Sequence, residues 1–119
     1  MEPFVTSGGR NPVNDALRRM DWRSRSIVVG MIEDANSALE TNATANLEDL
    51  FLYEVEGPDD EPAGDHVFRL YCMRADCDQP PSVIRALVLE QKPRRPWPPH
   101  DFKLAKERRD DWCRRSGKV

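Results

Sequence analysis

Hydrophobic residues recur every three or four positions in the first part of the chain. The spacing holds over residues 12–20 and again, for nearly five turns, from Trp22 to Leu39. It places the apolar side chains on one face of a helix. Asn11 and Asp21, which can cap a helix, stand immediately before the two segments. We therefore predict two helices whose apolar faces pack on a sheet.

Beyond residue 50 the apolar positions alternate with a period of two, which is typical of strands. Three segments show this pattern, namely 50–56, 67–73 and 83–90. The third is apolar on both faces for much of its length, so we place it inside the sheet. The short connections favour an antiparallel meander. Residues 41–46 are predicted to be a polar loop, and residues 1–6 allow one brief strand or a disordered start.

The C-terminal part begins with a basic segment, 92–100, that holds four prolines. Four prolines remove too many N–H donors for a helix or an inner strand, so we predict a stiff loop. Residues 101–115 form an amphipathic pattern in which Trp112 packs inward and Arg108 belongs to the charged outer side. The elements together predict one α+β domain over 1–119. Its two N-terminal helices pack on a small, mainly antiparallel sheet that a C-terminal helix closes.

Composition restricts the class of protein. The chain has 119 residues, 33% of them charged, and a mean hydropathy of -0.72. No apolar run approaches the roughly 18 residues of a membrane span. The N-terminus carries Glu2 and Pro3 rather than a basic segment followed by an apolar stretch. We therefore expect a soluble, cytoplasmic protein with no membrane partner.

The net charge of -3 averages two very different halves. Residues 1–66 hold 5 basic and 14 acidic residues, whereas residues 67–119 hold 13 basic and 7 acidic ones. The basic surplus is concentrated in residues 92–119, with 10 basic and 4 acidic residues. Such asymmetry points to a polyanion at one face of the protein.

The three cysteines form an odd number in a chain without an export signal, so we predict reduced thiols rather than a disulfide framework. Cys72 and Cys77, with His66 nearby, resemble a fragment of a zinc site. The chain has no C-x-x-C motif and no second pair of ligands. We expect no metal and no cofactor, and a zinc-stabilised small domain stays as an alternative.

Phosphate chemistry is the strongest candidate for a site. Arg69 shares one face of the strand 67–73 with Tyr71, and the segment that leaves the neighbouring strand supplies cations and an imidazole. A guanidinium binds phosphate through paired hydrogen bonds, and a lysine or imidazole beside other cations can accept a proton. The candidate catalytic residues are Arg69, Tyr71, Lys92 and His100, and the candidate RNA-binding residues are Arg94, Arg95, Trp97, Lys103 and Lys106.

Simpler interpretations apply to the same residues. Arg69 can pair with an acidic residue on a neighbouring strand, as strand cations commonly do. The run from Lys92 to Arg95 can be a solvated basic loop. Trp97, among prolines, can fill the core, contact a partner or stack on a base.

Four segments in collinear order resemble the HigB-like, phage-derived branch of the RelE/ParE toxin superfamily. They are Asn11–Leu17, Leu52–Val55, Val67–Tyr71 and Pro98–Ala105, and the resemblance extends as far as Trp112. It implies a compact toxin of a type II toxin–antitoxin pair. Relatives of this kind cleave mRNA in the ribosomal A site without a metal, the 2'-hydroxyl attacking the adjacent phosphate.

The resemblance also implies roles and partners. Arg69 would hold the phosphate, Lys92 would act as the base or stabilise charge, and Arg94 and Arg95 would contact the RNA backbone. The partners would be a cognate antitoxin of the helix-turn-helix type, the ribosome and its mRNA.

Two alternatives come from a different functional class. One is a non-catalytic inhibitor that binds a protein target such as DNA gyrase, as ParE relatives do, and the other is an inactive toxin-fold interaction module. A nuclease needs Arg69 and Lys92 to face one another across an open groove. A binding protein needs only an exposed helix face.

Overall fold

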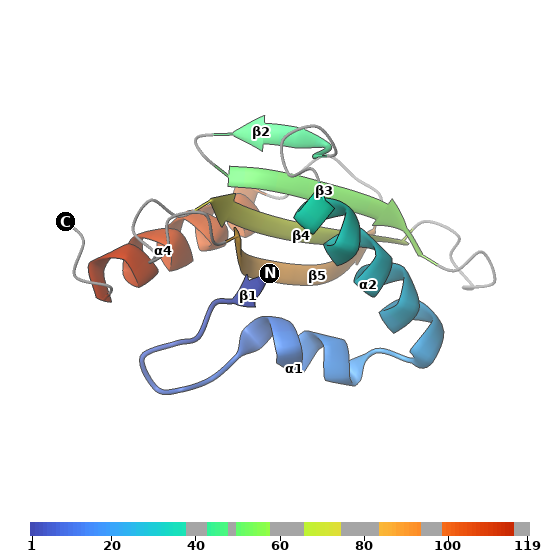
Figure 1. The fold of residues 1–119 in the computed structure, drawn as a ribbon, viewed down its shortest axis with the longest axis horizontal. Coiled ribbons are helices and arrows are strands. Elements are labelled where there is room, and N and C mark those ends of the chain that lie inside the picture. The colour runs from blue at the N-terminus through green and yellow to red at the C-terminus, as the bar shows by residue number, and fades with distance from the viewer. Residues whose placement is uncertain (38–42, 48–49, 58–65, 75–83, 94–98, 116–119) are drawn as a thin grey trace.

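The computed structural model describes residues 1–37, 43–47, 50–57, 66–74, 84–93 and 99–115, and the statements below refer to these ranges. They form three helices and a five-stranded sheet (Figure 1). In chain order the elements are β1 (Glu2–Pro3), α1 (Pro12–Arg19), α2 (Trp22–Ser37), β2 (Ala45–Leu47), β3 (Leu50–Glu56), β4 (His66–Arg74), β5 (Ile84–Pro93) and α4 (Pro99–Arg115). The predicted α+β class is confirmed.

The strands lie in the order β1-β5-β4-β3-β2. Strands β2 to β5 pair with their sequence neighbours in antiparallel fashion, which is the predicted meander. The brief strand β1 pairs with β5 in parallel. Because β1 and β4 flank β5 on its two sides, β5 is an inner strand, as its apolar composition predicted.

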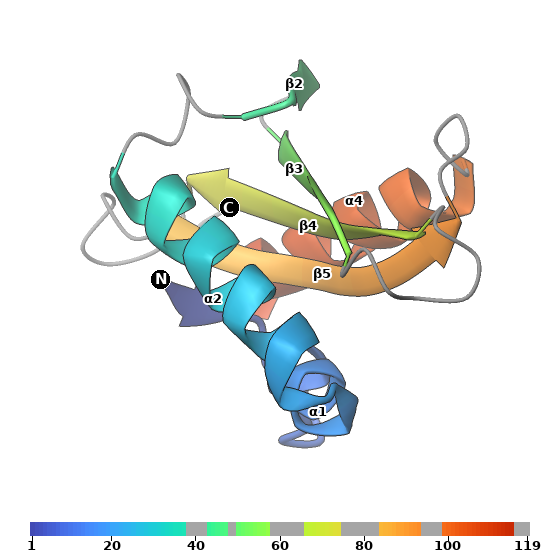
Figure 2. The ribbon, with the colours of Figure 1, turned by 90° about the vertical axis from the view of Figure 1, so that its right-hand side faces the viewer.

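Helices cover both faces of the sheet, with α2 on one face and α4 on the other (Figure 2). The alternation along β4 sets this arrangement. Phe68, Leu70 and Cys72 pack with residues of α1 and α2, whereas Tyr71 and Met73 pack with the α4 side, as the sequence pattern predicted.

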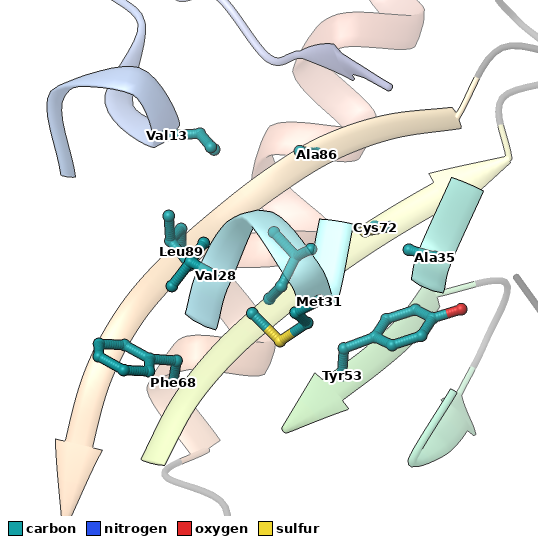
Figure 3. Close-up of a cluster of buried hydrophobic side chains, with 10 residues drawn as sticks. Val13, Val28, Met31, Ala35, Tyr53, Phe68, Cys72, Ala86 and Leu89 are labelled. Carbon is teal, nitrogen blue, oxygen red and sulfur yellow. The ribbon is translucent and has the colours of Figure 1, made fainter. Parts of the chain in front are cut away.

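The core beneath α2 is closely packed (Figure 3). Val28, Met31 and Ala35 recur at helical spacing on α2 and are almost fully buried. They meet Phe68 of β4 and Leu89 of β5 in one cluster. Burying side chains of this size stabilises the fold by about 1.5–3 kcal/mol each.

Local polar contacts define where α1 and α2 begin. The side chain of Asn11 accepts a hydrogen bond from the backbone N–H of Asn14 at 3.0 Å, and Pro12 occupies the first helical turn. The Asp21 carboxylate accepts a bond from the N–H of Ser24 at 2.8 Å. That bond is the main cause that lowers the pKa of Asp21.

Two segments that were predicted to be loops lie partly in strands or in a helix. Ala45 and Asn46 belong to β2, because they pair with Leu52 and Phe51 of β3, a contact that polarity does not reveal. Lys92 and Pro93 are the last residues of β5, and His100 lies in the first turn of α4. Proline is tolerated at a strand end and in a first helical turn, because the backbone N–H that it lacks would not be needed for a hydrogen bond within the element there.

Two side-chain orientations also differ from the prediction. Trp22 is 74% exposed and does not join the core stripe of α2. Successive residues of a helix are about 100° apart, so Trp22 lies about 120° around α2 from Val28. The side of α2 that carries Val28 faces the sheet, and Trp22 therefore does not. Arg108 was predicted on the outer side of α4, but it is half-buried and donates to the carbonyl of Leu87 at 2.6 Å. Its long apolar stem lets the guanidinium reach back to the sheet.

Among the residues that the structure describes, no helix is both long and apolar enough to cross a membrane.

Candidate functional site

Arg69 lies at the centre of a charged row that crosses three strands. It stands directly opposite Glu54 of β3 and Glu90 of β5 in the sheet register. Its Nε donates to Oε2 of Glu54 at 3.2 Å. The Arg69 side chain is 1% exposed, and that of Glu54 is 23% exposed. The cross-strand ion pair that the sequence allowed is therefore present, and the guanidinium is enclosed.

Tyr71 is two residues along the same face and is equally buried. Burial raises its pKa to about 12, and the negative charge of Asp101 adds to the effect. Asp101, in the first turn of α4, is itself fully buried. Its carboxylate and the Tyr71 hydroxyl thus belong to one buried polar cluster between the sheet and α4.

Arg108 closes the other side of this cluster. Its Nη1 bonds to the carbonyl of Leu87 on β5. Burial lowers the pKa of Arg108, and the nearby Glu90 carboxylate opposes that shift. Arg69 is paired with Glu54, and the Arg108 guanidinium lies near the Glu90 carboxylate. These opposite charges lower the cost of burying the two arginines, and Arg108 joins α4 to the sheet.

The structure describes some of the other candidate residues fully, some by their backbone alone and some not at all. Lys92 pairs with Val67 of β4, the strand that carries Arg69, and it belongs to the end of β5 rather than to the predicted loop. On α4, Lys103 is exposed, and the Lys106 ammonium lies 4.6 Å from the ring centre of Phe102. The structure gives only the backbone of Lys92 and His100. Arg94, Arg95 and Trp97 lie outside the described residues.

The cysteines depart from the prediction of three reduced thiols. Cys113 is disulfide-bonded, and its partner lies outside the described residues. Cys72 is free and fully buried in the core beneath α2, where burial raises the pKa of its thiol. Within the described ranges, no group of three or more His, Cys, Asp or Glu residues could hold a metal ion. Cys77, which the zinc alternative also needs, is not among these residues.

Sequence reasoning found Arg69 and Tyr71 but missed the acidic residues around them. Glu54 and Glu90 each interrupt an apolar strand, and a charge in such a position signals a partner within the sheet. Asp101 is the acidic residue in the first turn of α4. A negative charge there interacts favourably with the positive end of the helix dipole.

Comparison of the chain with protein-family models, curated proteins and solved structures gives no match.

Proposed function

We propose that this protein is a toxin of the RelE/ParE type that acts on RNA and cleaves ribosome-bound mRNA. The observation that carries the proposal is the row of Glu54, Arg69 and Glu90 with Tyr71 beside it, fixed on the α4 face of the sheet. The general α+β class, with helices on both faces of a mainly antiparallel sheet, is compatible with the proposal. A cognate antitoxin would neutralise the toxin.

The proposed reaction needs no change of oxidation state. The 2'-oxygen of one ribose bonds to the adjacent phosphorus, the bond from phosphorus to the 5'-oxygen breaks, and the 2'-proton passes to a base. The leaving 5'-oxygen takes up a proton, so that the products are a cyclic 2',3'-phosphate and a 5'-hydroxyl. Arg69 would hold the phosphate, and Lys92 or His100 would accept the proton. With a pKa of about 12, Tyr71 keeps its proton at neutral pH, so it can donate but not accept.

In the structure α4 lies over this row. Asp101 is fully buried, and Arg69 is 1% exposed. In this structure the Arg69 guanidinium therefore offers RNA almost no exposed surface. This burial favours a second candidate function, a non-catalytic inhibitor of the same fold that acts by binding a protein target.

Expression in a bacterial host tests the proposal. We expect the wild-type chain to arrest growth, and we expect Lys92→Ala and Tyr71→Phe to relieve the arrest. Tyr71→Phe removes only a hydroxyl, so it separates lost chemistry from lost folding. Arg74→Ala, an exposed position on the same strand, is the control and should leave the arrest intact. If the wild-type chain were harmless, the toxin proposal would be wrong.

Mapping the 5' ends of cellular mRNA after induction separates the two candidates. New 5'-hydroxyl ends within coding regions are expected for the nuclease and should be missing with Lys92→Ala. Growth arrest without new mRNA ends, combined with DNA breaks trapped by gyrase, would instead identify the binding inhibitor.

A further inference from the structure

The acidic half of the chain contains one local concentration of positive charge. All five basic residues of the segment 1–66 are arginines between positions 10 and 25. Four of them lie at the junction of α1 and α2, namely Arg18, Arg19, Arg23 and Arg25. We call this junction, residues 18–25, the α1–α2 corner. It lies at one end of the two helices, away from α4 (Figure 1).

Trp22 stands in the middle of the corner and is 74% exposed. Of the described residues, only Trp22 and Val29 are exposed large hydrophobic side chains. Burial would stabilise an indole of this size, so a ligand that covers the Trp22 ring would recover that free energy. A flat aromatic ring between arginines is the combination that single-stranded nucleic acids bind, because bases stack on the ring and guanidinium groups hold phosphates.

The corner is held in a fixed geometry by one of its own arginines. The Arg25 side chain donates to the carbonyl of Leu17 at 3.2 Å and to that of Met20 at 3.0 Å. These bonds cap the end of α1 and join it to the first turn of α2. Arg25 is thereby used structurally. Arg18 and Arg19, in the last turn of α1, are exposed and lie four and three positions before Trp22 in the sequence.

The two acidic side chains nearby do not cancel this charge. Asp21 is used as the cap of α2, and its carboxylate accepts a bond from the N–H of Ser24. Asp15 lies one turn back on α1, where its backbone carbonyl accepts a bond from Nε of Arg19. With four arginines against two carboxylates, the corner has a net positive charge.

A pocket of about 430 Å³ connects the corner with the sheet. Its lining includes Arg19, Asp21 and Ser24 of the corner and Leu89 and Gln91 of β5. Gln91 immediately precedes Lys92, the first residue of the basic segment. Arg19 and the last part of β5, far apart in the sequence, therefore line the same pocket.

We propose that the α1–α2 corner is a second RNA-binding surface, in which Trp22 stacks on a base of single-stranded RNA while Arg18 and Arg19 contact neighbouring phosphates. The inference rests on the proposed function only for the choice of RNA as the polyanion. It assigns no catalytic role to the corner.

Binding of a fluorescent 2'-O-methyl RNA of about 12 nucleotides, measured by anisotropy on the full-length chain, tests the proposal. This RNA lacks the attacking hydroxyl, so its binding does not depend on cleavage. Trp22→Ala should weaken binding about fivefold or more, because one stacked base is lost, and Trp22→Phe should restore most of it. Val29→Ala, on the same helix, is the matched control and should bind like the wild type.

The salt dependence of the same binding tests the arginines. Replacing both Arg18 and Arg19 by Gln should reduce the slope of log K against log salt concentration by roughly 1.4, since each phosphate contact with a single strand contributes about 0.7. Arg10→Gln, which removes one charge before α1, should leave the slope unchanged, whereas Arg18→Gln alone should reduce it by about 0.7. Binding to heparin should be insensitive to Trp22→Ala, because heparin has no bases.

The proposal is overturned if Trp22→Ala binds the RNA as tightly as the wild type, or if Arg10→Gln changes the slope as much as one corner substitution. It is also overturned if corner variants keep full RNA affinity and yet lose growth arrest, since the corner would then contact a protein. Normal corner-dependent binding without any mRNA cleavage would leave this inference standing and contradict the proposed function instead.

Discussion

A buried guanidinium needs compensating negative charge, and Arg69 finds it on both neighbouring strands. The same enclosure that satisfies the charge keeps solvent and ligands away from it. Arg69 therefore has a structural role in the closed form, whatever its part in chemistry. Any variant at this position changes folding as well as function.

Arg69→Ala should lower the free energy of unfolding by about 2–3 kcal/mol, because it removes a buried side chain and leaves the half-buried Glu54 without its cation. Urea denaturation measures the change. Arg74→Ala, exposed on the same strand, should stay within about 0.5 kcal/mol of the wild type. Replacing Arg69 and Glu54 together by Met should recover much of the loss. An unchanged unfolding midpoint for Arg69→Ala would contradict the buried ion pair.

The two tyrosines of the chain should both resist ionisation, since burial raises the pKa of Tyr53 and of Tyr71 to about 12. In the unfolded chain they ionise near pH 10. Between these values the unfolded state has lost protons that the folded state keeps, so the free energy of unfolding should fall as pH rises from 10 to 12. Absorbance titration of the native protein should show no tyrosinate at pH 10. A Tyr53→Phe/Tyr71→Phe variant should show a shallower fall.

Cys72 should be chemically silent in the folded protein. Its thiol is buried and its pKa is raised, so little thiolate forms and reagents cannot reach it. We expect iodoacetamide to modify Cys72 only after denaturation, as read by peptide mass spectrometry. Cys113 should resist the reagent until the protein is reduced. Labelling of Cys72 under native, non-reducing conditions would show that the core opens.

At the level of elements, short polar motifs decide where helices begin. α1 has only eight residues, which is too short to be stable alone. It depends on its cap and on the buried Val13. The alternation of β4 likewise assigns each of its side chains to one of two helical layers, and this explains why one strand contributes both to the apolar core and to the charged row.

Asn11→Ala should lower the free energy of unfolding by about 1 kcal/mol, because the backbone N–H of Asn14 loses its acceptor. Asn11→Gly should cost only a few tenths of a kcal/mol, because glycine also suits a cap position. Thermal denaturation of the two variants and the wild type gives the comparison. Equal effects of Ala and Gly would argue against the cap.

Over the whole molecule, the segment that follows β1 packs against the C-terminal half of α4, and we call this contact the clamp. Phe4 follows β1 and meets Trp112 of α4 edge to face, with ring centres 6.1 Å apart. Arg85 of β5 stacks on Trp112 at 4.0 Å, and Arg115 of α4 bonds to the carbonyl of Val5. This clamp fixes the C-terminal half of α4, whereas Asp101 in its first turn is buried near Tyr71.

Phe4→Ala should lower the free energy of unfolding by about 3 kcal/mol, since Phe4 is 3% exposed and its loss leaves a cavity under α4. It should also speed amide hydrogen exchange in α4 more than in α2, because only α4 loses a contact. Val29→Ala, an exposed position on α2, should change neither quantity. Uniform acceleration in all helices would contradict a local clamp.

Local patterns in the sequence were enough to predict most elements. Spacing and caps located α1 and α2, and period-two alternation located β3, β4 and the inner strand β5, because these signals depend only on neighbouring residues. They also placed Arg69 and Tyr71 on one face of β4. The sequence further separated an acidic first half from a basic second half.

Only the tertiary structure decided how those residues are used. Pairing across strands put Glu54 and Glu90 beside Arg69 and buried the Arg69 side chain, although 15 residues separate Glu54 from Arg69. The packing of α2 left Trp22 exposed among the arginines that flank it in the sequence, and it placed Arg19 in a pocket with the last part of β5. Whether a side chain is exposed or ion-paired depends on contacts between segments that are distant in the sequence. The sequence determines these contacts through folding, but they cannot be recognised from neighbouring residues alone.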